Sequence, residues 1–155
     1  MGSVQISAKA DYAVRALLVM AAAPAGAPQT GRTIAASQQM PVKFLENTLV
    51  ELRISGLVRS QRGAGGGFSL AKPADQITIA EVVRAVDGPL TQVRGDRPET
   101  LEYDAPATAL QHVWIAVRAR IRSVLEHVTL ADVASGRIPP EIEALTHDPD
   151  AWLPH

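Results

Sequence analysis

The first forty residues alternate between apolar runs and breaks in a way that predicts two helices. Ser7 is a suitable N-cap for a helix in which Val14, Leu17, Leu18 and Ala21 recur at helical spacing. The segment 24–28, Pro-Ala-Gly-Ala-Pro, ends that helix. Thr30 can then cap a brief second helix through residues 33–37. The pattern predicts a long helix followed by a short one.

A third helix is predicted after Pro41, and its two sides differ in character. Its apolar side carries Phe44, Leu45, Leu49 and Leu52, whereas Lys43, Glu46, Asn47 and Val50 fall on the other side. Two short helices at a tight turn, the second with an outward polar strip, are typical of a helix-turn-helix that reads DNA. Any amphipathic helix hairpin would show the same pattern, so this signal alone leaves both interpretations open.

The next segment predicts a β-hairpin directly after the third helix. Residues 56–62 indicate a helix stop and a short strand, residues 63–67 are a glycine-rich turn, and residues 68–70 return as a second strand. Such a hairpin beside a reading helix is a wing, on which Arg59 and Arg62 can reach phosphates or the minor groove. A phosphate-binding loop is the alternative, but it requires a Lys-Ser/Thr pair and a helix after its glycines, and here Phe68 and a strand follow.

The remaining pattern predicts a helix, a loop and a longer helix. The helix lies within residues 77–86, with Thr78 as its cap, and the polar stretch 91–106 is predicted to be a loop. Apolar residues then recur at steps of three and four: Leu110, Val113, Trp114, Val117, Ile121, Val124, Leu125 and Val128. We expect this seam to pair with a second copy of the chain in a two-fold dimer. The alternative is that the helix folds back on its own domain.

Composition excludes several chemistries and hints at a polyanionic partner. The chain has 155 residues, 46% of them hydrophobic, and a net charge of -1. Residues 1–75 hold eight Lys and Arg against four Asp and Glu, and the remainder holds seven against twelve. A basic front suits nucleic acid, although uneven distribution by chance gives the same counts. The absence of cysteine excludes disulfides and any cluster or metal held by thiolates.

Several segments together resemble a known family of bacterial regulators. These are residues 6–17, the run Phe44-Leu45-Glu46, residues 52–57, the wing 62–68 and residues 128–132. They are similar to the winged helix-turn-helix regulators that include IscR, NsrR and CymR, over roughly residues 4–135. The resemblance implies a dimer whose third helices enter successive major grooves of a near-palindromic site, with the wings in the flanking minor grooves.

The resemblance also implies roles for individual residues. Glu46 and Asn47 correspond to positions that meet base edges, and Lys43 lies at the leading turn. The wing is expected to contact DNA through Arg59, Arg62, Gly63 and Gly65, and Ser7 and Lys9 are expected to anchor phosphates.

The chain differs from members of this family that hold an iron-sulfur cluster, because it lacks the cysteines that bind the cluster. Relatives that sense iron-sulfur status hold a cluster through cysteines in the loop that corresponds to residues 91–109, and this loop has none. His112 lies near a ligand position of the family, and we interpret it as structural because it has no partner ligands. No cofactor is therefore expected.

These observations predict a mainly α protein with a small β-hairpin. The expected parts are a winged helix-turn-helix head (4–88), a loop (89–107), a dimerisation helix region (108–135) and a tail (136–155). The longest uncharged apolar stretch, 16–23, is too short to span a membrane, so a cytoplasmic location is expected. We expect a homodimeric regulator of double-stranded DNA, not an enzyme, with an unidentified small-molecule or protein effector. The alternative is a winged-helix module that binds protein and never contacts DNA.

Overall fold

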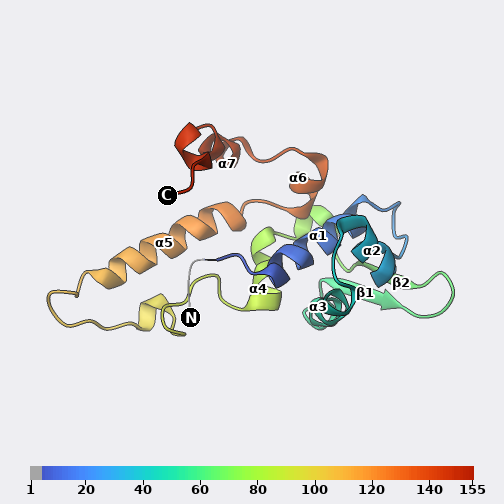
Figure 1. Cartoon of the computed structure of the whole chain (residues 1–155), viewed down its shortest axis with the longest axis horizontal. Helices are drawn as coiled ribbons and strands as arrows, with labels where there is room; N and C mark the ends of the chain where they lie inside the picture. The colour runs from blue at the N-terminus through green and yellow to red at the C-terminus, as the bar shows by residue number, and fades with distance from the viewer. Residues whose placement is uncertain (1–4) are drawn as a thin grey trace.

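The computed structural model describes residues 5–155 and shows three helices at the start of the chain (Figure 1). The first predicted domain began at residue 4, which lies outside the described residues. Helix α1 spans Ala8–Ala22, α2 spans Gly31–Gln38 and α3 spans Val42–Ile54. Ser7 Oγ caps α1 by accepting from the Ala10 amide at 2.9 Å, and Thr30 caps α2 in the same way. The three predicted helices are confirmed.

The hairpin is also confirmed, and it has an additional pairing that the sequence pattern did not predict. Strand β1 covers Val58–Gln61 and pairs antiparallel with β2, Gly67–Leu70, with Val58 opposite Leu70. Gln29, in the segment between α1 and α2, forms an isolated antiparallel bridge to Phe68. The wing is thus fastened to the helix-turn-helix through its second strand.

The second half of the chain contains α4 (Ile79–Asp87), α5 (Leu110–Leu125) and α6 (Leu130–Ser135). A 3-10 turn at Pro98–Thr100 lies within the predicted loop. Thr129 and Asp132 form a capping box that starts α6, so the region predicted as one dimerisation unit consists of two helices. The tail holds α7 (Pro140–Glu143) and two 3-10 turns, Ala144–Thr146 and Pro149–Trp152.

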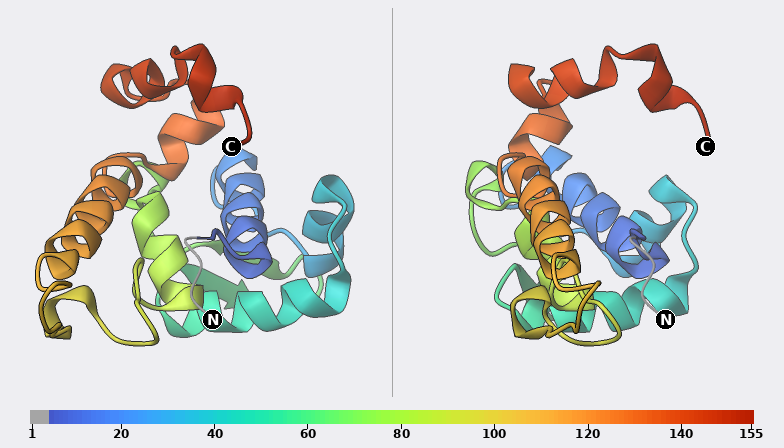
Figure 2. Two further views of the ribbon diagram at one scale, coloured as in Figure 1. Left: turned by 60° about the vertical axis from the view of Figure 1, so that its left-hand side comes forward. Right: turned by 90° about the vertical axis from the view of Figure 1, so that its left-hand side faces the viewer.

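Helix α1 lies at the centre of the head, where α2, α3, α4, α6 and β2 all pack against it (Figure 2). The core is made of aliphatic side chains without solvent exposure, among them Leu17, Ile34, Leu45, Leu49, Leu52, Ile77 and Leu130. Leu130 belongs to α6, so a segment beyond α5 closes the core of the head. The head is therefore not complete at residue 88.

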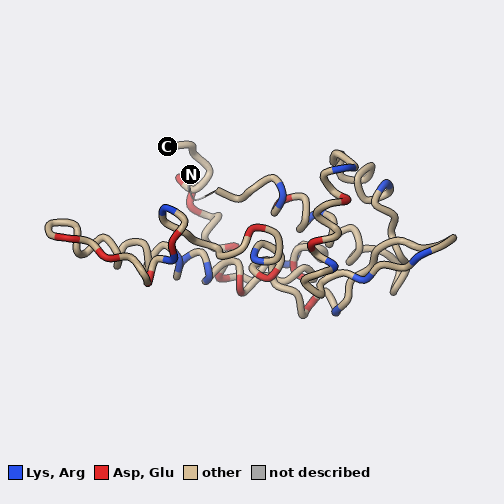
Figure 3. The backbone as a smooth tube through the Cα atoms, turned by 90° about the horizontal axis from the view of Figure 1, so that it is seen from below, with Lys and Arg blue, Asp and Glu red and all other residues tan. Residues whose placement is uncertain are grey.

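Helix α5 and the loop before it extend away from the head and give the molecule an elongated shape (Figures 1 and 2). Figure 3 shows Lys and Arg positions along the wing end and acidic positions at the opposite end, in the loop before α5. No helix in residues 5–155 is long and apolar enough to cross a bilayer.

Candidate nucleic-acid interface

The outward side of α3 presents three polar side chains in a row. Lys43, Glu46 and Asn47 are exposed, whereas Leu45 and Leu49 on the opposite side are fully buried. Glu46 and Asn47 follow Lys43 by three and four residues, which is about one helical turn. The three side chains therefore fall on the same side of the helix. The polar strip therefore lies free while the apolar side holds α3 in the head.

The aromatic and basic residues of α1 fix the beginning of α3 and the turn before it. Phe44, predicted on the packing side, is 40% exposed, and its ring is nearly perpendicular to the Tyr12 ring, with the two ring centroids 5.3 Å apart. The Arg15 guanidinium lies over the Tyr12 ring, 5.3 Å from its centroid, and donates to the Gln38 carbonyl at the end of α2. Gln39 takes a left-handed conformation with φ 54° at the turn. These contacts set the angle between α2 and α3.

The tip of the wing is built so that the chain can reverse tightly beside Arg62. Gly63 and Gly65 have φ values of +91° and +75°, in the left-handed region that favours glycine. A Cβ at Gly66 would lie 2.2 Å from the Gln61 carbonyl oxygen, so only glycine fits there. The Arg62 side chain is exposed at this turn. Arg59 points elsewhere, because its Nη2 donates to the Ala71 carbonyl at 3.0 Å.

Two residues predicted to anchor phosphates have partners within the chain. Ser7 Oγ donates to Asp87 Oδ2 at 2.5 Å while it caps α1. Lys9 Nζ lies 3.3 Å from Glu51 Oε1 and 3.1 Å from the Val86 carbonyl oxygen. These bonds join the start of α1 to α3 and α4. A DNA phosphate would have to compete with these partners within the chain for the Ser7 hydroxyl and the Lys9 ammonium group.

The seam predicted on α5 is only partly covered by the single chain. None of the residues of α5 is buried, and Val113 is 50% exposed. The other seam residues within the helix are half-buried, and Trp114 donates from Nε1 to the Tyr103 hydroxyl at 3.1 Å. Helix α5 packs on its own chain mainly through α4 and the turn at Pro98–Thr100.

Val128 differs from the rest of the predicted seam. Helix α5 ends at Leu125, and Val128 is only 6% exposed. Its carbonyl oxygen accepts from the Ile79 amide at 2.9 Å. Its side chain is therefore covered by this chain, and the uncovered apolar surface ends with the helix.

The loop before α5 does not offer a ligand set for iron. The chain contains no cysteine, and no group of three His, Asp or Glu side chains that could hold a metal ion occurs in residues 5–155. His112, predicted to be structural, is exposed in the first turn of α5. The residues present do not fit a cysteine-ligated cluster.

Comparison with known proteins identifies the family. Residues 6–136 match the model of the Rrf2 family, described as iron-dependent transcriptional regulators. A Mycobacterium tuberculosis chain named as an HTH-type transcriptional regulator, Rv1287, is 48% identical over 144 residues, which cover 93% of this chain and 89% of the relative. The HTH-type transcriptional regulator CymR of Bacillus subtilis is 34% identical over 131 residues, which cover 84% of this chain and 90% of CymR.

Solved structures agree with this assignment. The structure of CymR of B. subtilis, named there as the global cysteine regulator, superposes with a TM-score of 0.72 at 34% identity and covers 84% of this chain and 96% of its own. IscR of T. potens superposes with a TM-score of 0.68 at 28% identity, and the match covers 97% of this chain and 93% of that IscR chain. The chain therefore belongs to the Rrf2 family of winged helix-turn-helix transcriptional regulators, DNA-binding proteins of bacteria, and it is a member without cysteine.

Proposed function

We propose that this regulator binds a near-palindromic operator as a homodimer and reads it with α3 and the wing. The observation that carries the proposal is the exposed strip of Lys43, Glu46 and Asn47, held beside a wing whose exposed tip carries Arg62. Recognition of this kind requires a rigid helix whose polar side chains are free to contact bases, and a second contact that fixes the position of the helix along the DNA.

Each side chain of the strip has a chemical partner in the major groove. The Glu46 carboxylate accepts from the amino group of cytosine, and the Asn47 amide pairs with adenine. Lys43, one turn earlier, neutralises a phosphate. Arg62 and the backbone of Gly63 and Gly65 approach the minor groove, whose narrow regions attract guanidinium groups. Arg59 supports the base of the wing through its hydrogen bond to the Ala71 carbonyl, and its proposed DNA contact requires this bond to break.

The uncovered face of α5 supports the dimer. No residue of α5 is fully buried, and Val113 is 50% exposed, so part of the apolar side of this helix is in contact with water, which pairing with a second copy removes. The proposed contact runs from Leu110 to Leu125. Two-fold pairing places the reading helices roughly 34 Å apart, one turn of B-DNA, or a multiple of it. Because the chain reads DNA, its place of action is the cytoplasm.

Selection from a library of random duplexes tests this proposal and identifies the operator at the same time. We expect the purified protein to enrich one near-palindromic sequence, and its affinity for that sequence to fall steeply as salt rises. Arg62→Ala should weaken binding by roughly 1 to 3 kcal/mol. Arg137→Ala is the matched control, because Arg137 is exposed in the segment after α6 and far from α3. Enrichment of no sequence would favour a protein-binding module instead.

A further inference from the structure

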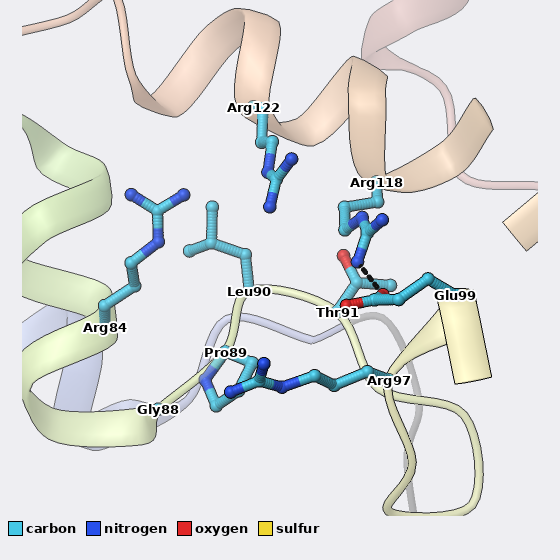
Figure 4. A pocket seen from close by; sticks show the side chains of 9 residues that line it. All are labelled: Arg84, Gly88, Pro89, Leu90, Thr91, Arg97, Glu99, Arg118 and Arg122. Carbon is cyan, nitrogen blue, oxygen red and sulfur yellow. Dashed lines mark hydrogen bonds and ion pairs between the residues drawn. The ribbon is translucent and has the colours of Figure 1, made fainter. Parts of the chain in front are cut away.

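A cavity of about 380 Å³ lies between α4, the segment 88–99 and α5. Four arginines line it: Arg84 from α4, Arg97 from the loop, and Arg118 and Arg122 from α5. Figure 4 shows the guanidinium groups of Arg84 and Arg122 beside Leu90, that of Arg118 turned toward Glu99 and Thr91, and Arg97 extended beneath Leu90 toward Pro89. These residues are far apart in the sequence, and only the fold brings them together.

The positive charge around this cavity is incompletely neutralised. Glu99 pairs with Arg118, and Glu126, next to the cavity, pairs with Arg84 and lies 3.8 Å from Arg122 Nε. Four guanidinium groups thus face two carboxylates, which leaves two positive charges in excess. The Arg118 side chain is only 17% exposed, so its charge is held in a partly desolvated place. A concentration of positive charge of this kind attracts an anion.

Thr91 supplies a second, independent observation. Its Oγ1 is buried and has no hydrogen-bond partner, although a buried hydroxyl normally finds one. Thr91 lines the same cavity, and Figure 4 shows its side chain beside those of Arg118 and Glu99. This hydroxyl can donate to an anionic oxygen bound between the arginines once the ligand displaces the side chain that covers it, as a ligand that takes the place of the neighbouring Glu99 carboxylate would.

We propose that this arginine cavity binds a small molecule that carries a dianionic phosphate group. Guanidinium groups present paired N–H donors that match the oxygens of such groups. The charge of a dianion equals the excess of two. The volume lies within the roughly 300 to 1,000 Å³ of small-molecule sites and exceeds what one tetrahedral anion fills. The side chains of Pro89 and Leu90 face the remaining space and suit an organic portion.

The position of the cavity gives such a ligand a regulatory consequence, which rests on the proposed function. Arg84 belongs to the head through α4, whereas Arg118 and Arg122 belong to the proposed dimerisation helix. An anion held by both elements changes the orientation of the head relative to α5. Because the spacing of the two reading helices depends on that setting, DNA affinity changes with ligand binding.

Binding is tested by calorimetry on the full chain without DNA. The probes are glycerol 3-phosphate against uncharged glycerol, and inorganic phosphate against inorganic sulfate, which separates preference for phosphate from binding of any tetrahedral dianion. We expect glycerol 3-phosphate or one of the inorganic dianions to bind, and glycerol not to bind. Arg97→Gln and Arg118→Gln should weaken binding roughly tenfold or more, because each removes a charged hydrogen bond. Arg97 is exposed, so its variant keeps the test valid if Arg118→Gln does not fold.

Arg120→Gln is the matched control, since Arg120 is exposed on the same helix and does not line the cavity. Equal weakening by Arg120→Gln, or no binding of any dianion, would overturn the proposal.

In a second arm, the selected duplex is titrated with and without the bound dianion. A change in DNA affinity that disappears in Arg97→Gln supports the regulatory step. Loss of DNA affinity in Arg97→Gln without any ligand would show that the arginines contact DNA instead. Dianion binding with no DNA binding at all would contradict the proposed function and leave the site intact.

Discussion

The backbone of Gln29 pairs with that of Phe68 in both directions, with N···O distances of 2.8 and 2.7 Å. Gln29 directly precedes the cap of α2, and Phe68 lies in the second strand of the wing. The reading helices and the wing are therefore held together by backbone hydrogen bonds, which do not depend on side-chain rotamers.

Gly67→Ala is expected to break this connection. A Cβ at Gly67 would lie 2.6 Å from the Gln29 carbonyl oxygen, and the residue has a φ of +144°. We expect a loss of roughly 2 to 3 kcal/mol in the free energy of unfolding, measured in urea. Gly26→Ala is the control, because Gly26 also has positive φ but no atom within 4 Å of its added Cβ, and it should lose only about 1 kcal/mol. Equal losses in the two variants would show that the bridge does not hold the wing.

The ion pair between Lys9 and Glu51 is expected to serve stability rather than DNA contact. Its side chains are more than a third exposed, so Lys9→Ala and Glu51→Ala should each cost roughly 0.5 to 1 kcal/mol, and the double variant little more. The salt dependence of DNA binding should be unchanged in Lys9→Ala, because the two carboxylate oxygens and the Val86 carbonyl already take its three donors. A salt slope reduced by about one would instead identify Lys9 as a phosphate contact.

Acid should weaken the link between the loop and α5. The pKa of Glu99 lies below its ordinary value of 4.5, because its own backbone amide and then Arg118 donate to the carboxylate. A pKa that is lower in the folded state adds stability above the unfolded value, and this stability is lost as pH falls through the folded value. We therefore expect Glu99→Gln to be less stable than the natural chain at neutral pH, and the difference to shrink as pH falls below 4.5 and to vanish once pH is below the lowered pKa of the folded state. A difference independent of pH would contradict this.

The proposed dimer contact is tested by Val113→Asp. Val113 is 50% exposed, so the charge costs little in a single chain but is placed in an apolar contact in the dimer. Sedimentation should show a monomer at concentrations where the natural chain is a dimer. Ile54→Asp makes the same change on the 77% exposed Ile54 at the end of α3, and it should remain dimeric. A dimeric Val113→Asp chain would exclude the α5 contact.

The sequence predicted those features that depend on local periodicity. The two sides of α3 follow from helical spacing, and the wing follows from glycines between two short strands. The seam was extended to Val128 because the apolar spacing continues there, although no Pro or Gly marks the end of α5. The Thr-x-x-Asp pattern at Thr129 resembles a capping box and could have located the start of the next helix.

Features that join distant segments could not be predicted in this way. The bridge from Gln29 to Phe68 and the ion pair from Lys9 to Glu51 each connect residues about forty positions apart. The arginine cavity combines residues between 84 and 122 that show no common motif. Their arrangement depends on how α4 and α5 are packed, which no local pattern describes.

The ratio of affinities for the selected duplex and a scrambled duplex, at one fixed salt concentration, tests the central claim most directly. Operator recognition by α3 predicts a ratio on the order of a thousand or more for the natural chain. Asn47→Ala and Glu46→Ala should each lose roughly 1 to 3 kcal/mol on the selected duplex and little on the scrambled one. Equal affinity of the natural chain for both duplexes would contradict the claim that α3 reads sequence.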